Sequence, residues 1–552
     1  MSSPLPPSGP RLRVFISDTH IGLGRVLQKK STGRHTEGQW HPTEDFRWAA
    51  DLRAFMDMVR AESGRLKVST DLIIVGDFLE LWQSPIKICT LEPCSDDERA
   101  GKLKRDCEYA GNENLGCSPE EALARARRVL GAHAETLAIL REFANAGDNR
   151  VVIVPGNHDA ALVFNAVAGL TVREIGAAPG RVRVAAEGYW LSADGLLFAE
   201  HGHQIEGDPN KFEALPASCL DRAGRSVSCN SGGQRFLQRP WGENFVQKYY
   251  EQYEARFSIL DNIADRNEGI VLGIFAAGIG DSIVAVRDGF KFLLFQQSVS
   301  QALQALGPEG PIPQYDFKAI RESGDAFLVD SVPPTEERAA LRAEAARALA
   351  QGSLKVSVKD LSDEEIQTLC DLRESARAAQ LKAGGVPTTA QCPQAGPPKL
   401  GADVPGSLGG VAVDLFTTER KRFQRRFRDL RDALRQSGRP TADFQVYVYG
   451  HTHQAHTARQ PFGNRPDWSP LMLNSGAWQR LATRDQLAEI RKKNGIETWQ
   501  TLLALGPEDL PACYSFIFVQ PYAEGRRGDI RPELLWWVRT SGGWRTLERC
   551  AP

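Results

Sequence analysis

Five short apolar runs, each followed at once by a polar signature, constrain the fold of this chain most. The runs are rich in branched residues, and a continuous run of this kind is typical of a buried strand. The five pairs are Leu12–Ile16 with Ser17-Asp18-Thr19-His20, Leu72–Val75 with Gly76-Asp77, Val151–Val154 with Pro155-Gly156-Asn157-His158-Asp159, Leu196–Ala199 with Glu200-His201-Gly202-His203, and Phe444–Tyr449 with Gly450-His451-Thr452-His453. Because ligands gather beyond the carboxyl ends of strands in open α/β sheets, we expect the five signatures to form one site.

The sequence between the runs predicts helices and further strands. Glu44 to Glu62 carries apolar residues on one helical face. Ser118 is a good N-cap, with Pro119 at the first helical position and Glu121 as the partner of a capping box, and this helix is expected to run towards Phe143 and to stop by Gly147. Strands are expected at Leu471–Leu473, Tyr514–Val519 and Glu533–Val538, with a hairpin-like pair at Arg181–Ala185 and Leu196–Ala199. We therefore predict an α/β (α+β) fold, a two-sheet β-sandwich flanked by helices.

The composition excludes several classes of protein. The 552 residues are 42% hydrophobic, and 67 Lys and Arg against 69 Asp and Glu give a net charge of −2. These values exclude a disordered chain and argue against a body that coats nucleic acid through bulk positive charge. The most apolar stretch, Ile270 to Val286, is interrupted by Asp281 and is interpreted as a buried helix, because it is short for a membrane span. Without a signal-peptide pattern near the start, the expected location is cytoplasmic.

The ten cysteines leave alternatives open. Their even number and loop-like surroundings are typical of disulfides, whereas a cytoplasmic location would keep thiols reduced. A zinc site is a third reading for the first four, although they lack a C-x2-C pair. The cysteines are Cys89, Cys94, Cys107 and Cys117 in one polar stretch, the close pairs Cys219 with Cys229 and Cys370 with Cys392, and then Cys513 and Cys550.

The signatures divide the chain into parts. Residues 1–10 are expected to be a flexible tail, and residues 11–210 to be the first part of a catalytic domain with a Cys-bearing insertion at 86–117. Residues 211–440 are expected to be a helical insertion or cap with a Pro/Gly-rich linker at 384–410, and residues 441–552 to complete the catalytic domain. Within the cap, Glu336 to Gln351 is Ala-rich helical sequence, and Ser362 to Glu365 is a capping box.

The chemistry of the signatures indicates metal ions. Carboxylate and amide oxygens mixed with imidazoles suit Mn, Fe, Zn, Co or Ni, and there are too many donors for one ion that keeps an open coordination position. Two ions sharing one carboxylate, about 3.5–4 Å apart, fit better. The seven expected ligands are Asp18, His20, Asp77, Asn157, His201, His451 and His453.

Together, the five signatures resemble those of the calcineurin-like metallophosphoesterases, over roughly residues 11–210 and 441–540. The resemblance implies that Asp18, His20 and His453 hold a first metal, that Asp77 bridges, and that Asn157, His201 and His451 hold a second. It implies two divalent ions, Mn²⁺ first and Fe, Zn, Co or Ni as alternatives, with a hydroxide between them that attacks phosphorus. His158 would assist the leaving group or bind the phosphate, and Asp159 would orient His158.

Within that family, Gly76 to Trp82 and His201-Gly202-His203 are similar to the bacterial UDP-diacylglucosamine pyrophosphatases. This chain departs from them by carrying His158 where they carry Arg and His203 where they carry Asp, and by its greater length. The lipid-nucleotide substrate is therefore left open.

Several neighbouring residues have competing readings. His203 is interpreted as pointing away from His201, with a supporting or substrate-contacting role as the alternative. Glu80 is expected to accept a hydrogen bond behind the ligands, and Asn474 to serve either a turn or the site. His456 is expected in solvent. The remaining histidines, His35, His41 and His133, are expected to be surface or core residues.

A basic amphipathic segment precedes the last signature. Glu419 to Arg439 contains nine Lys or Arg and three acids, with apolar residues at helical spacing. An ordinary helix with a solvated cationic face is the favoured reading, and contact with an anionic membrane or nucleic acid is the alternative. A further hypothesis places Arg422, Arg425 and Arg426 against a phosphate-bearing substrate.

The sequence thus predicts a metal-dependent hydrolase that cleaves a phosphomonoester, phosphodiester or pyrophosphate in a small substrate. The alternatives are a nuclease of the same fold acting on DNA or RNA, and a partner-binding scaffold built on the fold. Peripheral membrane contact is a further partner hypothesis, and the sequence does not indicate an oligomeric state.

Overall fold

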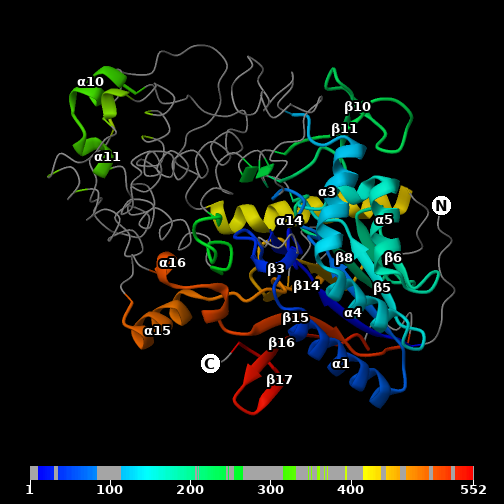
Figure 1. Cartoon of the computed structure of the whole chain (residues 1–552). Coiled ribbons are helices and arrows are strands. Elements are labelled where there is room, and N and C mark those ends of the chain that lie inside the picture. The colour runs from blue at the N-terminus through cyan, green and yellow to red at the C-terminus, as the bar shows by residue number, and fades with distance from the viewer. Residues whose placement is uncertain are drawn as a thin grey trace. The chain divides into compact units, whose positions relative to one another are not determined.

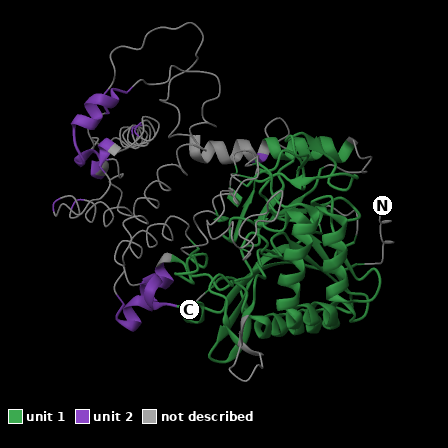
Figure 2. Ribbon diagram, turned by 45° about the horizontal axis from the view of Figure 1, so that its top comes forward, with its two compact units in different colours: residues 1–264, 424–483, 506–552 green, residues 265–423, 484–505 purple. Residues whose placement is uncertain are grey.

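The computed structural model describes residues 10–29, 35–83, 114–205, 208, 210–240, 242–243, 246–247, 254–264, 315–330, 346, 350, 357–360, 366, 370, 392–393, 414–436, 443–459, 468–496, 501–523 and 529–550. The chain divides into two compact units (Figure 2). The first comprises residues 1–264, 424–483 and 506–552, and the second comprises residues 265–423 and 484–505. The second unit is narrower than the expected insertion at 211–440, and it takes residues 484–505 from the expected C-terminal part.

A seven-stranded mixed sheet carries the first three signatures. Its parallel strands β1, β4, β5 and β6 lie side by side, and on the other side of β1 the sheet continues with β15, β16 and β17, each antiparallel to the strand before it. The strands in order across the sheet are β17 (Gly543–Leu547), β16 (Pro532–Thr540), β15 (Cys513–Val519), β1 (Leu12–Ile16), β4 (Thr70–Val75), β5 (Arg150–Val154) and β6 (Val182–Val184). Because β1, β4 and β5 are parallel, the residues that follow them leave the same edge of the sheet.

A five-stranded mixed sheet carries the other two signatures. Its parallel strands β8, β12 and β14 are flanked by antiparallel β7 and β13. The order is β13 (His456–Arg459), β14 (Leu471–Asn474), β12 (Val446–Tyr449), β8 (Leu197–Glu200) and β7 (Tyr189–Leu191). Small sheets pair β2 (Arg25–Lys29) with β3 (His35–Trp40), and β9 (Cys219–Leu220) with β10 (Ser226–Val227) and β11 (Phe236–Leu237).

The two large sheets pack face to face, as the alternation of side chains along each strand requires. Phe15, Val75 and Val448 belong to a buried core that both sheets share, and the Phe15 ring lies 5.6 Å from the Trp190 ring of β7. Val14, which precedes Phe15 in β1, belongs to the core on the opposite face of the seven-stranded sheet. The fold is therefore α+β, with two sheets forming a sandwich.

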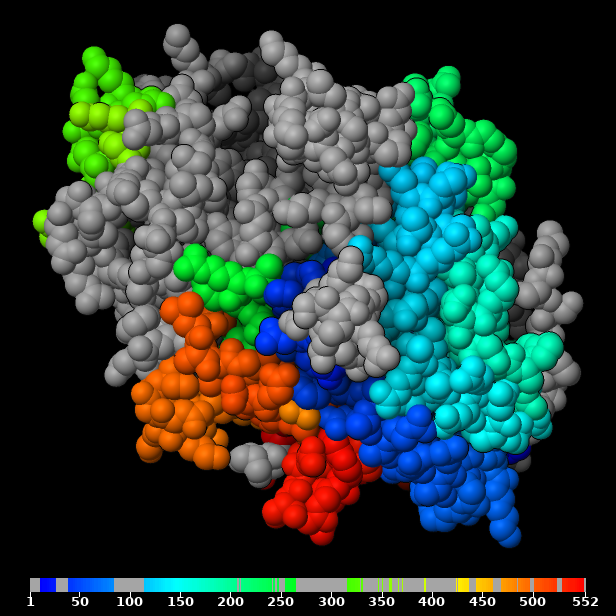
Figure 3. Space-filling view, in the orientation of Figure 1, coloured from blue at the N-terminus to red at the C-terminus, as the bar shows by residue number. Residues whose placement is uncertain are grey.

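Helices cover the outer face of the seven-stranded sheet (Figure 1). They are α1 (Ala49–Leu66), α3 (Pro119–Ala132), α4 (Ala134–Ala144) and α5 (Asn165–Ile175), with the short η1 (Ala160–Val163) before α5. On this side the ring of Phe55 in α1 lies 6.2 Å from that of Trp537 in β16. The surfaces of α1 and of the C-terminal hairpin accordingly lie next to each other in the view of Figure 3.

The helix boundaries follow from local hydrogen bonds. α1 begins at Ala49, later than the sequence predicts, because the Glu44 carboxylate accepts from the backbone N–H groups of Gly22, Gly24 and Phe46 and so holds the preceding residues in a loop. The predicted capping box of Ser118 and Glu121 is confirmed at the start of α3. The expected single helix to Phe143 is interrupted at His133, whose buried ring reaches to 3.3 Å from Glu44.

The described side chains of α14 (Asp414–Gln436) show how its C-terminal half packs. Phe427, Leu430 and Leu434 are buried, and the Phe427 ring lies 4.9 Å from that of Tyr447 in β12. This half of the helix covers the outer face of the five-stranded sheet. The amphipathic character of the helix and the exposure of part of its cationic face are therefore confirmed for residues 425–435, and contact of that face with an anionic membrane or nucleic acid stays a hypothesis.

The predicted hairpin of Arg181–Ala185 with Leu196–Ala199 is wrong. β6 pairs in parallel with β5 in the seven-stranded sheet, and β8 pairs with β7 in the other sheet. The chain crosses from one sheet to the other through the turn around Gly188, where φ is +80°. A residue there with a Cβ would also meet Pro216 at 2.5 Å.

The second unit has its own small core, formed by Tyr315, Ile320, Phe327, Val358, Ile366 and the disulfide between Cys370 and Cys392. Its described elements are α10 (Phe317–Glu322), α11 (Ala326–Asp330), η4 (Val358–Asp360), α15 (Arg484–Asn494) and α16 (Thr501–Ala504). The predictions for Ile270–Val286, Glu336–Gln351, Ser362–Glu365 and residues 384–410 lie largely outside the described residues.

The described cysteines form disulfides. Cys219 pairs with Cys229, Cys370 with Cys392 and Cys513 with Cys550, and Cys117 is also disulfide-bonded. Cys89, Cys94 and Cys107, with most of the insertion 86–117, lie outside the described residues. Because disulfides persist in oxidising compartments, they argue against the cytoplasmic location that the sequence predicts. None of the described helices is both long enough and apolar enough to cross a bilayer.

Candidate metal centre

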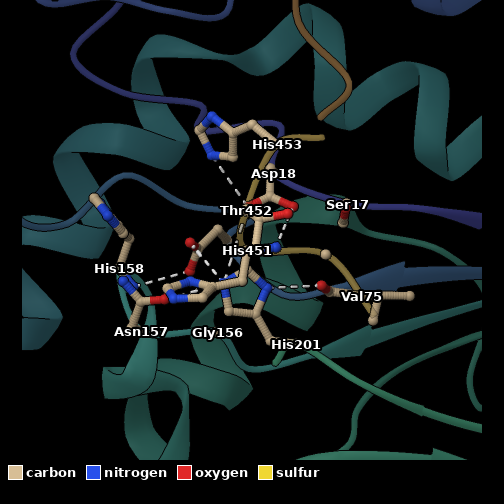
Figure 4. A network of polar contacts seen from close by, with 12 residues as sticks. Ser17, Asp18, Val75, Gly156, Asn157, His158, His201, His451, Thr452 and His453 are labelled. Carbon is tan, nitrogen blue, oxygen red and sulfur yellow. Dashed lines mark hydrogen bonds and ion pairs between the residues drawn. The ribbon is translucent and has the colours of Figure 1, made fainter. Parts of the chain in front are cut away.

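The five strand ends converge at one edge of the sandwich and bring all seven expected ligands together. Figure 4 labels five of them, Asp18, Asn157, His201, His451 and His453. The ligand atoms form overlapping groups, in each of which they lie within 4.8 Å of one another. The groups are Asp18 with His20 and His453, His20 with Asp77 and His158, and Asp77 with His201 and His451. Asn157 joins the last group, because its Oδ1 lies 3.0 Å from His201 Nε2.

The first group surrounds one oxygen of Asp18. Asp18 Oδ1 lies 3.3 Å from His453 Nε2 and 3.8 Å from His20 Nε2. The other oxygen, Oδ2, accepts from the backbone N–H of His451 at 3.1 Å. Asp18 Oδ1 and His20 Nε2 are both buried without a hydrogen-bond partner among the described residues. A buried carboxylate oxygen and an imidazole nitrogen left in this way are the donors that a metal ion requires.

The second group is organised by His201. Its Nδ1 lies 2.9 Å from the carbonyl oxygen of Val75, so Nδ1 donates its proton there. Nε2 then faces Asp77 Oδ2 at 2.9 Å and Asn157 Oδ1 at 3.0 Å. A nitrogen lone pair and two oxygens that face one another need a cation or a proton between them. Burial disfavours protonation of His201, but the carboxylates of Asp77 and Asp18 outweigh it and raise the pKa of His201 to about 9.

The two carboxylates of the centre are held in their charged form. Burial by itself would raise the pKa of Asp18, but the neighbouring imidazoles of His201, His20 and His453 hold it well below its usual range. Burial and the imidazoles of His201 and His158 act on Asp77 in the same opposing way, and its pKa is also lowered. Asp77 lies between the groups, since its Oδ2 is 3.7 Å from His20 Nε2 and 2.9 Å from His201 Nε2. The donor set thus fits two divalent ions with Asp77 shared.

The backbone of the centre adopts a conformation that side chains rarely allow. Asp18, His20, Asp77, His451 and His453 all have positive φ, between 45° and 71°. Among the non-glycine residues that the structure describes, Lys67 at the end of α1 is the single other case. Left-handed backbone of this kind costs roughly 1–2 kcal/mol per residue, and it concentrates at functional sites.

Two glycines in the signatures are required by close packing. A Cβ at Gly156 would lie 2.1 Å from Asp77 Oδ1, and a Cβ at Gly450 would lie 2.4 Å from Asp18 Oδ2. Neither distance is compatible with a side chain. These glycines let the backbone approach the two carboxylates directly.

His158 lies at the border of the centre and is half-exposed. Its Nδ1 is 2.5 Å from Glu80 Oε2, its ring stacks on Trp82 with centroids 4.0 Å apart, and its backbone N–H donates to Asp77 Oδ1 at 2.9 Å. The same Glu80 oxygen is 2.9 Å from His20 Nδ1. Glu80 therefore accepts hydrogen bonds behind two histidines, as expected. Although its burial raises the pKa, the imidazoles of His158 and His20 lower the pKa of Glu80 to about 2.

Asp159 does not take the place expected for it. Its carboxylate accepts from the backbone N–H groups of Gly156, Phe78 and Leu79, at 2.6, 2.9 and 3.2 Å. These bonds tie the loop after β5 to the loop after β4. Glu80, rather than Asp159, therefore orients His158. Burial and the nearby charge of Asp77 raise the pKa of Asp159 to about 7.

Sequence reasoning missed one acidic contact. Asp208 Oδ2 lies 2.7 Å from His451 Nε2. No apolar run precedes Asp208, so the pattern that identifies the other site residues does not reach it. Of the open readings, Asn474 bears out both: its Oδ1 accepts from the Gly476 N–H at 2.8 Å in a turn, and its Nδ2 donates to the Gly450 carbonyl at 3.1 Å and to Thr452 Oγ1 at 2.8 Å, which supports the loop of His451 and His453.

The remaining histidines lie outside the groups. His203 is buried, its Nε2 is 3.4 Å from the Pro216 carbonyl, and burial with the neighbouring imidazoles lowers its pKa to about 3. His456 is exposed at the start of β13 and accepts from the Tyr449 hydroxyl at 2.8 Å. His133 is a core residue, and His41 bonds to the neighbouring Thr43.

Arg426 of α14 does not face the centre. Its guanidinium pairs with both carboxylate oxygens of Glu200, and Tyr447 donates to the same carboxylate at 2.7 Å. Glu200 is 1% exposed, so this pair is buried against the five-stranded sheet. The hypothesis that Arg426 contacts a phosphate-bearing substrate is therefore wrong. Arg425 is exposed, and the side chain of Arg422 lies outside the described residues.

No protein-family model matches this chain, and no curated protein matches it. The assignment of a role to the centre therefore depends on the fold and the geometry given above.

Proposed function

We propose that the chain is a dinuclear metal-dependent phosphoesterase of the calcineurin-like type. One observation carries the proposal: seven oxygen and imidazole donors from five strand ends gather in overlapping groups, and Asp77 belongs both to a group with His20 and to the group with His201 and His451. The unpartnered buried atoms Asp18 Oδ1 and His20 Nε2 support it, because they mark a place for a cation within the first group.

In the proposed arrangement, Asp18, His20 and His453 hold one ion, Asp77 bridges, and Asn157, His201 and His451 hold the other. Two divalent ions would supply charge neutralisation for the phosphate oxygens and a lowered pKa for water, and Mn²⁺ is the first candidate. The chain's own residues position the reacting groups. Glu80 and Trp82 fix the ring of His158, whose exposed edge would bind a phosphate oxygen or pass a proton to the leaving group.

The substrate class proposed is a phosphomonoester, phosphodiester or pyrophosphate. The two-ion arrangement serves all three, because each reaction displaces an oxygen from phosphorus in line with the attacking oxygen. All seven expected ligands are described residues with side chains that can bind metal, and they lie together. The geometry therefore favours an active enzyme over a scaffold.

The test begins with metal-free protein prepared by chelation and then supplied with Mn²⁺. Metal analysis is expected to give two Mn per chain, with hydrolysis of bis-p-nitrophenyl phosphate or p-nitrophenyl phosphate that depends on the metal. The ratio of the two rates separates a diesterase from a monoesterase. Fewer than one bound metal per chain, with neither ester hydrolysed, would refute the proposal.

A further inference from the structure

A second group of acidic side chains lies outside the candidate metal centre. We call that centre, formed by the seven expected ligands, the seven-ligand centre. Asp45, Glu254 and Asp261 offer carboxylate oxygens that lie within 4.8 Å of one another. Asp45 precedes α1, whereas Glu254 and Asp261 belong to the segment 254–264, far along the chain. Asp45 and Glu254 are buried, at 5% and 1% exposure, and Asp261 is half-buried. The fold thus brings three carboxylates from two distant segments together at one largely buried position.

Gln83 is an independent sign that this group receives a ligand. The side chain is 2% exposed, and its Nε2 donates to Glu254 Oε2 at 2.5 Å, which directs the amide into the group. Its Oε1 has no hydrogen-bond partner among the residues that the structure describes. A buried amide oxygen left without a donor costs about 1–3 kcal/mol. The Gln83 amide, which contacts the group through Glu254, thus has a buried oxygen that a cation or a donor would satisfy.

The electrostatics of the group point the same way. Burial and the neighbouring charge of Asp261 raise the pKa of Asp45 well above its usual value. Carboxylates this close repel one another unless a cation or a proton lies among them. A cation bound among the three carboxylates would remove this repulsion.

We propose that Asp45, Glu254, Asp261 and Gln83 bind one hard divalent cation, Ca²⁺ or Mg²⁺, at a site separate from the seven-ligand centre. All four donors are oxygens, which is the set that these cations prefer, whereas the imidazoles of the other centre favour transition metals. The two sites thus select different metals. This proposal does not depend on phosphoesterase activity.

The site's position gives it a consequence for the seven-ligand centre. The segment 254–264 touches the centre's surroundings at two points. Gln83, which bonds Glu254, follows the loop that carries Glu80, and Gln454, which follows His453, donates to the Ala264 carbonyl at 3.0 Å. A cation bound to Glu254 and Asp261 would hold this segment against both loops.

The experiment uses the full chain loaded with Mn²⁺ and then titrated with Ca²⁺ or with Mg²⁺. Calorimetry is expected to show one site per chain, and hydrogen exchange in 254–264 is expected to slow at least several-fold. Glu254→Gln and Asp45→Asn are expected to weaken this binding at least tenfold while retaining Mn²⁺. Asp57→Asn, an exposed acid in α1, is the control that should bind as the wild type does.

Two further measurements keep the test decisive. Thermal unfolding without Ca²⁺ or Mg²⁺ shows whether each variant folds, and Gln83→Met offers a second, nearly isosteric variant without the amide oxygen. Asp77→Asn should lose Mn²⁺ yet keep the Ca²⁺ response, which separates this site from the other centre. Absence of Ca²⁺ and Mg²⁺ binding in the folded wild type, or equal binding by folded Glu254→Gln and Asp45→Asn, would overturn the proposal.

Discussion

The two sheets contribute unlike halves to the seven-ligand centre. The seven-stranded sheet supplies both carboxylates, Asp18 and Asp77. Asp77 is fixed from the same sheet, by the backbone N–H of His158 and the close approach of Gly156 after β5, whereas Asp18 is fixed from the other sheet, by the N–H of His451 and the close approach of Gly450 after β12. The five-stranded sheet supplies His201, His451 and His453, three imidazoles. One half therefore sets the negative charge of the centre, and the other supplies most of the nitrogen donors that set its preference for a metal.

The halves also differ in what supports them. Behind the seven-stranded half, Glu80 and Asp159 are buried acids that bond directly to ligand rings or ligand loops. Behind the five-stranded half, Glu200 bonds Arg426 and Tyr447 and no ligand side chain. The acid that contacts a ligand ring on this side is Asp208, whose Oδ2 lies 2.7 Å from His451 Nε2 and which follows β8 in the chain instead of belonging to the sheet. We therefore expect substitutions of Glu80 to change metal binding, and substitutions around Glu200 to change stability.

The largest effect on activity is expected from Asp77→Asn, because Asp77 is the shared carboxylate. We expect phosphoester hydrolysis to fall at least a thousandfold and metal content to fall below two per chain, measured by ester hydrolysis and metal analysis. Asp71→Asn is the matched control, since Asp71 lies in β4, the strand that leads to Asp77, but pairs with Arg11 at 2.8 Å. Near-normal turnover of Asp77→Asn would break the assignment of the bridging role.

A smaller effect is expected from Glu80→Gln. Removing the charge behind His20 and His158 should lower metal affinity by roughly 10–100-fold, as for other supporting carboxylates of metal-bound histidines. Competition with a chelator of known affinity measures the loss. Glu142→Gln, an exposed acid in α4 that pairs with Arg53, serves as the control. An unchanged affinity would show that Glu80 only packs beside the rings.

The smallest effect on activity is expected from Arg426→Ala. Because this variant leaves Glu200 buried and unpaired, unfolding free energy should fall by about 3–5 kcal/mol, while Mn²⁺ stoichiometry and KM stay near their wild-type values. Urea unfolding measures the change. Arg428→Ala, an exposed neighbour on the same helix, should change stability by less than about 0.5 kcal/mol. A raised KM with unchanged stability would instead support the hypothesis that Arg426 contacts the substrate.

Local sequence predicted the parts of the fold that depend on local rules. The strands before all five signatures begin and end within two residues of their predicted bounds, because unbroken branched runs have few alternatives to a buried strand. The capping box at Ser118 was predictable for the same reason. The gathering of Asp18, Asp77 and Asn157 also followed, since they come after β1, β4 and β5, and parallel strands of one sheet deliver their carboxyl ends to one edge.

Other features depend on partners that are distant in sequence. The break at His133 arises from packing against Glu44, and the separation of β6 from β8 depends on the turn at Gly188, which no periodicity marks. The pairing of Arg426 with Glu200 joins residues 226 positions apart. A basic side chain near a site in sequence can thus be committed to a buried acid on the opposite face of a sheet.

The left-handed backbone at five ligand positions also limits how this chain can evolve. Glycine, asparagine and aspartate tolerate such backbone, whereas branched side chains do not. Replacing one of these five residues by valine or isoleucine would therefore strain the backbone of its loop, in addition to removing a donor atom. In a descendant that has lost the reaction but kept the fold, these positions are expected to carry small or amide residues. Under the proposed function, that pattern would identify a relative that has lost the metal centre.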